Sequence, residues 1–146
     1  MKPLVIGAFF IATLATAQAQ QRVPDLKGTW SGKGKAVVLG ANAHHPGTQR
    51  ASDAARVREI AATHVVEGQD GRLAWGHSTS AAAGDTKDPF VWALTGDNRT
   101  IIGADSDGHF RITLTGRDRM DKCYVHNGLS PSGSIVAACY TMTRKR

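Results

Sequence analysis

Apolar and polar residues alternate along much of the chain, in short segments that end at turn residues. One such segment places Phe110, Ile112 and Leu114 on one side, with polar residues at the positions between them. A period of two residues is typical of strands that bury one face. Counted along the chain, this pattern predicts about eight strands.

The connections between these segments are mostly short and rich in glycine, aspartate and asparagine. Asp107-Gly108 is a strong signal for a tight hairpin. Ser52–Ala62 is the one helix candidate, and we expect it to form a short helical turn or a loop that leads into a strand. Adjacent strands without helices between them predict an all-β fold. We expect an eight-stranded antiparallel up-and-down barrel, with a two-sheet β-sandwich as the alternative.

The first predicted strand, within Asp25–Gly40, has an unusual inner face. By alternation, that face carries one tryptophan followed by small residues: Trp30, Gly32, Gly34, Ala36 and Val38. Glycine in a strand leaves room for the close approach of another group. Either large rings from other strands fill this room, which gives a packed structural barrel with no ligand, or the room is a ligand cavity with tryptophan walls.

The other two tryptophans, Trp75 and Trp92, are also predicted to point inward. We therefore expect the three indoles to meet inside the barrel. Small-molecule sites are mainly apolar hollows with a few oriented polar groups. The sequence thus predicts that a small, largely apolar ligand binds in the barrel mouth. The expected ligand contacts are Trp30, Trp75 and Trp92 as walls, with His77, Tyr124 and His126 as polar partners.

The motif Gly28-Thr29-Trp30, at the start of the first predicted strand, resembles the opening of calycin barrels such as lipocalins and avidins. The resemblance implies an eight-stranded barrel in which the tryptophan closes one end beneath a basic side chain of the last strand. Arg144 is the matching residue here. The resemblance covers the two chain ends and the overall strand pattern.

Avidins follow this tryptophan with an asparagine two positions on and a serine six positions on, and both contact biotin. This chain has Gly32 and Ala36 at those positions. The polar groups that would hydrogen-bond a ureido ring are missing, and a site that lacks them loses most of its affinity. The resemblance therefore does not extend to biotin binding, and the later loop motif of lipocalins is not found.

The first residues have the features of a secretory signal peptide. Lys2 precedes an apolar run of about ten residues, and small residues stand at Ala17 and Ala19. The run is too short for a transmembrane helix, which needs about 20 residues. We therefore expect residues 1–19 to be removed. The product would be a secreted or periplasmic protein with no stable membrane span, in which residues 20–146 form one domain.

Cys123 and Cys139 are the two cysteines of the chain, and an oxidising compartment favours a disulfide between them. Both are equally far from Pro131, which lies in a turn-like segment. Folding the chain back at Pro131 places the two sulfurs on the same face of neighbouring strands. Such a cross-link stabilises a fold by about 3 kcal/mol.

No catalytic or metal-binding arrangement emerges from the sequence. The histidines lack the local spacing of zinc ligands, so we predict no metal; the place to look for one would be His44, His45 and His126. Asp105–Gly108 lacks the downstream glutamate of a calcium loop and is predicted to be a hairpin turn. Without a nucleophile motif or an acid–base pair, we assign no catalytic residue and no cofactor, and the sequence disfavours an enzyme without excluding one.

The formal charge of +6 is partly due to the tail Arg144–Arg146 and is typical of a solvated basic surface. We expect no nucleic-acid partner, because the aromatic platforms of single-strand binders are missing. The alternative to a small-molecule binder is an exported protein–protein module, such as a periplasmic protease inhibitor. Its free N-terminal segment would be Gln20–Pro24.

Overall fold

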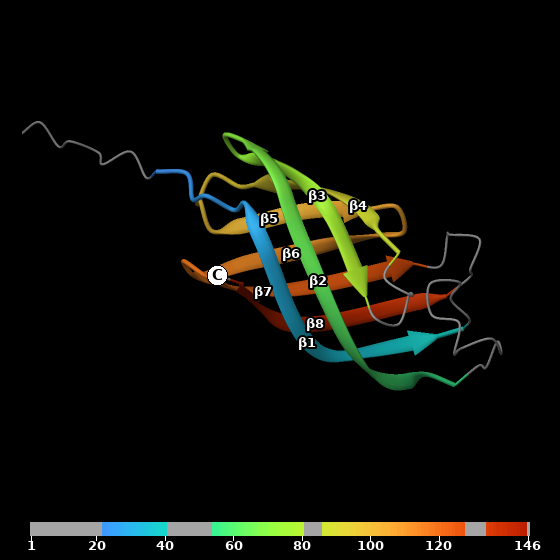
Figure 1. Cartoon of the computed structure of the whole chain (residues 1–146). Coiled ribbons are helices and arrows are strands. Elements are labelled where there is room, and N and C mark those ends of the chain that lie inside the picture. Colours follow the sequence, from blue (N-terminus) through green and yellow to red (C-terminus); the bar gives the residue numbers. More distant parts are fainter. Residues whose placement is uncertain (1–21, 41–53, 81–85, 128–133, 146) are drawn as a thin grey trace, which may run out of the picture.

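The computed structural model of the chain describes residues 22–40, 54–80, 86–127 and 134–145 (Figure 1). These residues form a closed barrel in which each strand pairs antiparallel with the next and the last strand pairs with the first. The predicted up-and-down barrel is confirmed, and the two-sheet sandwich is not formed. The strands are β1 (Gly28–Leu39), β2 (Arg56–Asp70), β3 (Leu73–Ser80), β4 (Asp88–Leu94), β5 (Thr100–Asp105), β6 (Gly108–Gly116), β7 (Arg119–Asn127) and β8 (Ile135–Arg144).

β2 begins at Arg56, so no residue from Arg56 onward belongs to the helical turn or loop expected within Ser52–Ala62, but the strand into which it was expected to lead is present. Every residue from Arg56 to Val66 pairs with a residue of β1. Tertiary pairing thus overrides the modest helix preference of the alanines in this segment. Residues 44–55, which precede this strand, lie outside the described residues except for the last two positions.

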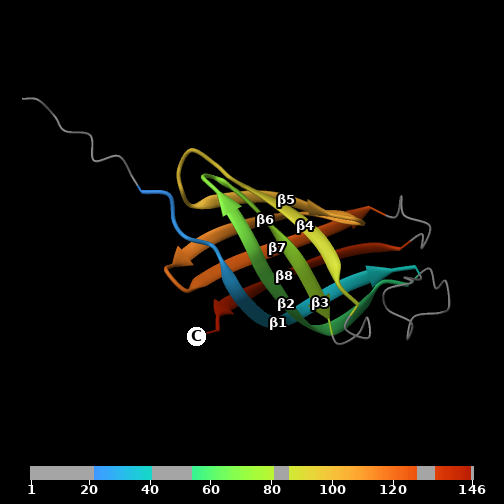
Figure 2. The same cartoon turned by 45° about the horizontal axis from the view of Figure 1, so that its top comes forward.

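The barrel has two ends (Figures 1 and 2). We call the end covered by the segment before β1 the closed end, and the other end, as far as the described residues go, the open end. At the closed end, β1 begins and the hairpins β2–β3, β4–β5 and β6–β7 turn. At the open end, β1 ends and the β5–β6 hairpin turns. Asp105 forms that turn by accepting hydrogen bonds from the backbone N–H groups of Asp107 and Gly108, at 3.1 and 2.8 Å, so the predicted hairpin is confirmed.

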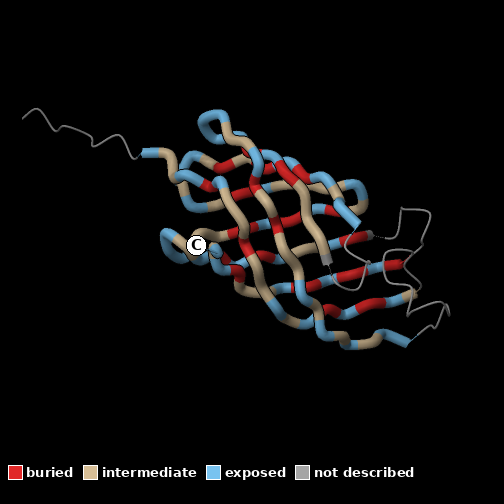
Figure 3. Tube along the Cα trace, in the orientation of Figure 1, coloured by how far each residue is buried: buried red, intermediate tan, exposed pale blue. Residues whose placement is uncertain are grey.

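Buried positions alternate with exposed positions along the strands (Figure 3). The inner side chains form two clusters of unequal size. The larger cluster contains Leu26, Trp30, Val66, Ala74, Phe90, Trp92, Leu94, Ile101, Phe110, Ile112, Met120 and Met142. The smaller cluster contains Ala36, Val38, Val136 and Ala138. Tyr124 and Tyr140 pack against both clusters and so lie between them.

The segment before β1 closes one end of the barrel. Leu26 is buried, and its carbonyl accepts a hydrogen bond of 2.9 Å from the indole N–H of Trp30. The guanidinium of Arg144 lies over the Trp30 ring, 4.5 Å from its centroid, as the resemblance to calycins implies. Gln69 secures the segment by accepting from the N–H of Leu26 and donating to the carbonyl of Pro24. The closed end is therefore a packed and hydrogen-bonded lid.

Trp75 lies on the outer wall of the barrel, so the prediction that it points inward is wrong. It is 47% exposed, whereas Trp30 and Trp92 are 0% and 2% exposed. His77 shares the outward face of β3, where its Nδ1 lies 2.8 Å from a carboxylate oxygen of the exposed Glu67. Only two of the three indoles therefore meet the expectation of burial inside the barrel.

Trp75 points outward because the inner face of β3 has no space for a large side chain. The inner positions of this strand carry Ala74 and Gly76. A Cβ at Gly76 would lie 1.9 Å from the carbonyl oxygen of Val65 and 3.0 Å from the Phe90 ring, so no side chain fits there. On the outside, Gly68 makes room for the indole of Trp75, because a Cβ at Gly68 would lie 2.2 Å from the ring. Strand alternation gives two faces, and here the larger residues occupy the outer one.

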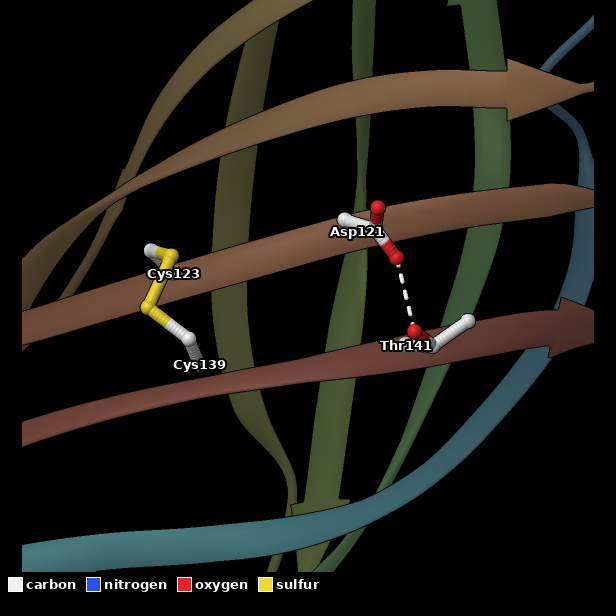
Figure 4. The surroundings of a disulfide bond; sticks show 4 residues. All are labelled: Asp121, Cys123, Cys139 and Thr141. Atoms are coloured by element: carbon white, nitrogen blue, oxygen red, sulfur yellow. Dashed lines mark hydrogen bonds between the residues drawn. A yellow bond between two sulfur atoms is a disulfide. The ribbon is translucent and has the colours of Figure 1, made fainter.

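Cys123 and Cys139 form a disulfide between β7 and β8, as predicted (Figure 4). The two residues are directly paired across the strands, with their Cα atoms 4.1 Å apart, and both are exposed on the outer wall. Two residues away on each strand, and on the same face, the hydroxyl of Thr141 donates a 2.7 Å hydrogen bond to Asp121. The disulfide and this hydrogen bond join the two strands from the outside.

The predicted signal peptide, residues 1–19, lies outside the described residues. In the ranges that are described, no helix is long and apolar enough to cross a membrane.

Candidate functional site

A cavity of about 430 Å³ occupies the open half of the barrel, and we call it the open-end cavity. Its wall includes apolar side chains from β1, β2 and β8 and polar side chains from β7, with carboxylates at the rim. The lining residues include Ala36, Val38, Ile60, Asp88, Asp107, Lys122, Tyr124, His126, Val136, Ala138 and Tyr140.

The cavity exists because inward-pointing side chains become smaller toward the open end. On β1 they change from Trp30 at the closed end to Ala36 and Val38 at the open end. On the neighbouring β8, Met142 lies at the closed end and Ala138 nearer the open end. Eight strands enclose an interior that side chains can fill or that can hold one small ligand. In this barrel side chains fill one half, and a cavity occupies the other.

The glycines of β1 make room for side chains of β8, and not for tryptophans. A Cβ at Gly34 would lie 2.5 Å from the Cβ of Tyr140. A Cβ at Gly32 would lie 3.0 Å from Cγ of Met142. Filling by a large ring from another strand is therefore confirmed in part, because Tyr140 of β8, together with Met142, occupies the room beside these glycines. The cavity begins beyond them and has no tryptophan in its wall.

Lys122 is a lysine that points into the barrel, and it is only 3% exposed. Its Nζ lies 2.9 Å from Nε2 of His64, which is 1% exposed. The same Nζ lies 4.2 Å from the centroid of the Phe110 ring and 5.6 Å from that of Tyr124. Lys122 also lines the open-end cavity. The amine is therefore largely surrounded by protein, and the residue forms part of the cavity wall.

The His64 ring belongs to an aromatic layer that we define as His64, Phe90, Trp92 and Phe110. Phe90 and Trp92 are stacked, with their centroids 4.7 Å apart. His64 lies 5.3 Å from Phe90, and Phe110 meets both Phe90 and Trp92 edge to face. Offset-stacked and edge-to-face pairs are the favoured aromatic arrangements. The layer gives Lys122 a rigid apolar neighbour on its closed-end side.

Burial changes the protonation of this pair. Desolvation lowers the pKa of Lys122 to about 7, although the carboxylates of Asp105 and Asp88 act in the opposite direction. Desolvation, and then the charge of Lys122, hold the pKa of His64 well below its usual value. His64 is therefore neutral at pH 7, and its Nε2 accepts a hydrogen bond from the Lys122 amine.

Two tyrosines line the cavity beside Lys122. Desolvation, followed by the negative charge of Asp105, raises the pKa values of both Tyr124 and Tyr140. Both hydroxyls therefore remain protonated and can donate hydrogen bonds at any physiological pH. The Tyr124 hydroxyl donates to Asp105 at 3.4 Å.

His126 provides a polar atom on the cavity wall that lacks a partner. The residue is 2% exposed, and its Nε2 has no hydrogen-bond partner among the residues that the structure describes. A buried polar atom without a partner costs about 1–3 kcal/mol. Such an atom on the wall of a cavity marks a position where a ligand group or water completes the hydrogen bond.

The structure separates the six predicted ligand contacts into three groups. Tyr124 and His126 line the open-end cavity. Trp30 lies in the closed end, and Trp92 lies in the aromatic layer; neither lines the open-end cavity. The third group, Trp75 and His77, lies on the outer wall.

Three residues in or beside the cavity were not predicted from the sequence: Lys122, His64 and Tyr140. A signal for Lys122 was present, because two-residue alternation places it with Met120 and Tyr124, whereas Cys123 lies on the opposite face. Lysine is almost never fully buried, so its position in the pattern would ordinarily be assigned to the outer face. The contact between His64 and Lys122 joins β2 to β7 across the barrel and has no local sequence signal.

Metal ligands were predicted to be absent, with His44, His45 and His126 as the place to look. His44 and His45 lie outside the described residues. Over the parts of the chain that are described, no three His, Cys, Asp or Glu side chains are grouped so that they could hold a metal ion.

No family model matches the sequence, and no curated protein matches it either.

Proposed function

We propose that this protein is an exported β-barrel that binds a small, largely apolar molecule in the open-end cavity. The observation that carries the proposal is a cavity of about 430 Å³ with mainly apolar walls and a few buried polar atoms on one side. Small-molecule sites have volumes of about 300–1,000 Å³ and this same division of surface. Ala36, Val38, Ile60, Val136 and Ala138 would contact the apolar part of the ligand.

The polar atoms suggest how the ligand is oriented. Lys122, Tyr124 and His126 all belong to β7, so three of the polar side chains of the wall lie along one strand. A ligand with one polar end would place that end against β7 and its apolar part against β1 and β8. The unpartnered Nε2 of His126 would gain a hydrogen bond on binding, which favours ligands with such a group.

We further propose that the protein is related to the calycins and works outside the cytoplasm. The eight-stranded closed barrel is compatible with a calycin-like fold, and Arg144 covers Trp30 as in that group. The disulfide is typical of oxidising compartments, which agrees with the signal peptide predicted for residues 1–19.

The test uses a neutral fluorescent probe, N-phenyl-1-naphthylamine, with the Ala138→Phe variant as the blocked form. Ala138 is 6% exposed and lines the cavity, so a phenyl ring there fills part of the space. Ala137→Phe is the matched control, because Ala137 is the next residue on β8 and is exposed on the outer wall. We expect probe fluorescence to rise with the original chain and with Ala137→Phe.

For Ala138→Phe we expect affinity to fall at least about tenfold, which corresponds to about 1.4 kcal/mol. 1-Nonanol should displace the probe from the original chain and from Ala137→Phe at similar concentrations, and should bind Ala138→Phe more weakly. Equal probe binding by all three proteins, or no binding by the original chain, would overturn the proposal.

A protein partner is the second candidate, and one feature of the outer wall favours it. Leu73, Trp75, Val91 and Ile102 are 58%, 47%, 62% and 55% exposed. Trp75 pairs directly with Val91 across β3 and β4, so these residues form a continuous apolar strip. Exposed apolar patches often mark protein contacts. Retention of one exported protein by the original chain, but not by a Trp75→Ser/Val91→Thr variant, would support this candidate.

The inhibitor hypothesis expects residues 20–24 to form a free segment, but the last of them is attached to the barrel. Pro24, its last residue, is held against the closed end through Gln69. Residues 20 and 21 lie outside the described residues. The protease-inhibitor hypothesis stays a prediction.

A further inference from the structure

We propose that Lys122 is a nucleophile for carbonyl compounds, and that its amine forms a reversible imine with a neutral apolar aldehyde held in the open-end cavity. This inference rests on the proposed function and names its ligand class.

The geometry gives Lys122 a setting that the other described lysines do not share. It is 3% exposed and lines the cavity, and its Nζ lies against His64 and the Phe110 ring. The remaining lysines in the described ranges are all exposed: Lys27, Lys33, Lys35, Lys87 and Lys145. A desolvated lysine in an apolar pocket is the usual form of an imine-forming lysine.

The charge state agrees with this role. Only the neutral amine has a lone pair to attack a carbonyl, and burial lowers the pKa of Lys122 to about 7. About half of the Lys122 amine is therefore neutral at pH 7, against about one part in a few thousand for an ordinary lysine. The titratable or charged groups that face Lys122 or line its cavity are Arg58, Glu59, His64, Lys87, Asp88, Asp105, Asp107, Tyr124, His126 and Tyr140.

His64 positions the amine for attack. Its Nε2 accepts one N–H of Lys122 at 2.9 Å. This contact holds the amine in place; with the ring proton of His64 on Nδ1, the amine donates and its lone pair stays available to a ligand. Because burial keeps His64 neutral, no second positive charge opposes the bond. His64 is thus a positioning residue, since it acts through Lys122.

The reaction balances without any further reactant. The nitrogen lone pair forms a C–N bond, the carbonyl π pair moves to oxygen, and one amine proton transfers to that oxygen to give a carbinolamine. The hydroxyl then leaves together with the second amine proton as one water molecule, and a C=N bond remains. No oxidation or reduction takes place, and water reverses the reaction.

A neutral aldehyde suits this cavity better than a fatty acid. The charged side chains of its wall are mixed in sign, with Arg58 and Lys87 beside Glu59, Asp88 and Asp107, so they do not select for an anion. Burying a charged group without a dedicated partner is costly. The neutral imine carries no charge into the apolar interior, whereas a carboxylate would add one.

The experiment treats the disulfide-bonded protein with nonanal and sodium cyanoborohydride, which reduces imines to stable amines, and maps the product by peptide mass spectrometry. At pH 7 we expect one nonyl group on Lys122, formed at least about 100-fold faster than on the exposed Lys33. Labelling of Lys122 should rise as pH increases through about 7, whereas exposed lysines should react only at higher pH.

Two variants accompany the map. Lys122→Met should lose the rapid labelling, and Lys33→Met should keep it, because Lys33 lies on the outer wall of β1. The map of the original chain decides the question even if Lys122→Met fails to fold. A His64→Gln variant should slow labelling of Lys122 by tenfold or more and leave 1-nonanol binding unchanged within about threefold.

The outcomes separate this inference from the proposed function. Labelling of Lys122 no faster than of Lys33, in a protein that still binds 1-nonanol, would overturn the imine alone. Failure to bind 1-nonanol would overturn the proposed function, and the imine with it. Rapid labelling of Lys122 that excess 1-nonanol suppresses would support both.

Discussion

Replacing Lys122 by methionine should stabilise the protein at acidic and neutral pH. Methionine has a similar length and no charge, so it suits the space between the aromatic layer and the cavity. The original amine is protonated below about pH 7, where the folded protein must hold a positive charge in a 3% exposed position. Removing that charge removes its desolvation cost.

The size of the effect follows from the two pKa values of Lys122. An ordinary lysine has a pKa of 10.5, and the folded protein lowers it to about 7. One pKa unit corresponds to about 1.4 kcal/mol, so the buried charge lowers the free energy of unfolding by about 5 kcal/mol below pH 7. Loss of the hydrogen bond to His64 costs about 1–3 kcal/mol. The net gain for Lys122→Met at pH 6 is therefore about 2–4 kcal/mol.

The sign of the pH dependence is fixed by which state binds the proton. Between about pH 7 and 10.5 the unfolded chain holds a proton on Lys122 that the folded protein releases. The stability contribution of Lys122 thus rises with pH across this window. The advantage of Lys122→Met should shrink by about 3–4 kcal/mol from pH 7 to pH 10. At pH 10 the variant should be less stable than the original by up to about 2 kcal/mol.

Urea denaturation of both proteins between pH 6 and pH 10, with the disulfide intact, measures this difference. Other titrating groups contribute to both proteins, so they largely cancel. Lys33→Met, on the outer wall, is the control and should stay within about 0.5 kcal/mol of the original at every pH. A difference between Lys122→Met and the original that does not change with pH would refute the reasoning, and so would a destabilised variant at pH 6.

Two further predictions concern the strands around the cavity. Replacing Cys123 and Cys139 together by alanine should lower the free energy of unfolding by about 3 kcal/mol, measured by urea denaturation without reductant; a loss below about 1 kcal/mol would contradict it. Gly34→Val should cost about 1–3 kcal/mol, because its Cβ would lie 2.5 Å from the Cβ of Tyr140. The matched Lys33→Val variant, whose side chain points outward, should change thermal stability little; equal losses in both would show that the contact with Tyr140 is not the cause.

Alternation and turn residues were enough to predict the barrel, because they act locally. Phe110, Ile112 and the turn at Asp107-Gly108 follow directly from a two-residue period and hairpin chemistry. The disulfide followed from symmetry about Pro131. These features depend on neighbouring residues or on a single hairpin.

The orientation of β3 could not be predicted in the same way. Alternation defines two faces of a strand but does not say which one is buried. The larger side chains of β3, including Trp75, would ordinarily be placed inside. The inner space had already been filled by Phe90 and Trp92 from the next strand, which leaves room only for Ala74 and Gly76. This competition between strands is visible only when they are assembled.

The candidate site was predicted in part for a related reason. Tyr124 and His126 are polar residues with aromatic rings, so either face of a strand suits them, and a site near the barrel mouth was a natural choice. Lys122 was missed because a buried lysine contradicts the rule that charges remain in water. Such contradictions are expected at functional positions, where a local rule is broken for a chemical purpose.

The unequal filling of the two halves also makes the barrel unevenly resistant to local opening. Amide hydrogens around the closed end, near Trp30 and Met120, should exchange with solvent only on global unfolding, since large side chains hold this half together. Those around Ala36 and Ala138 have fewer apolar neighbours and should exchange through smaller fluctuations. A bound guest would supply the contacts that these small residues lack, and at a hundred times its dissociation constant it would add about 2.7 kcal/mol to the folded state. A bound ligand would thus complete the hydrophobic core in this half of the barrel.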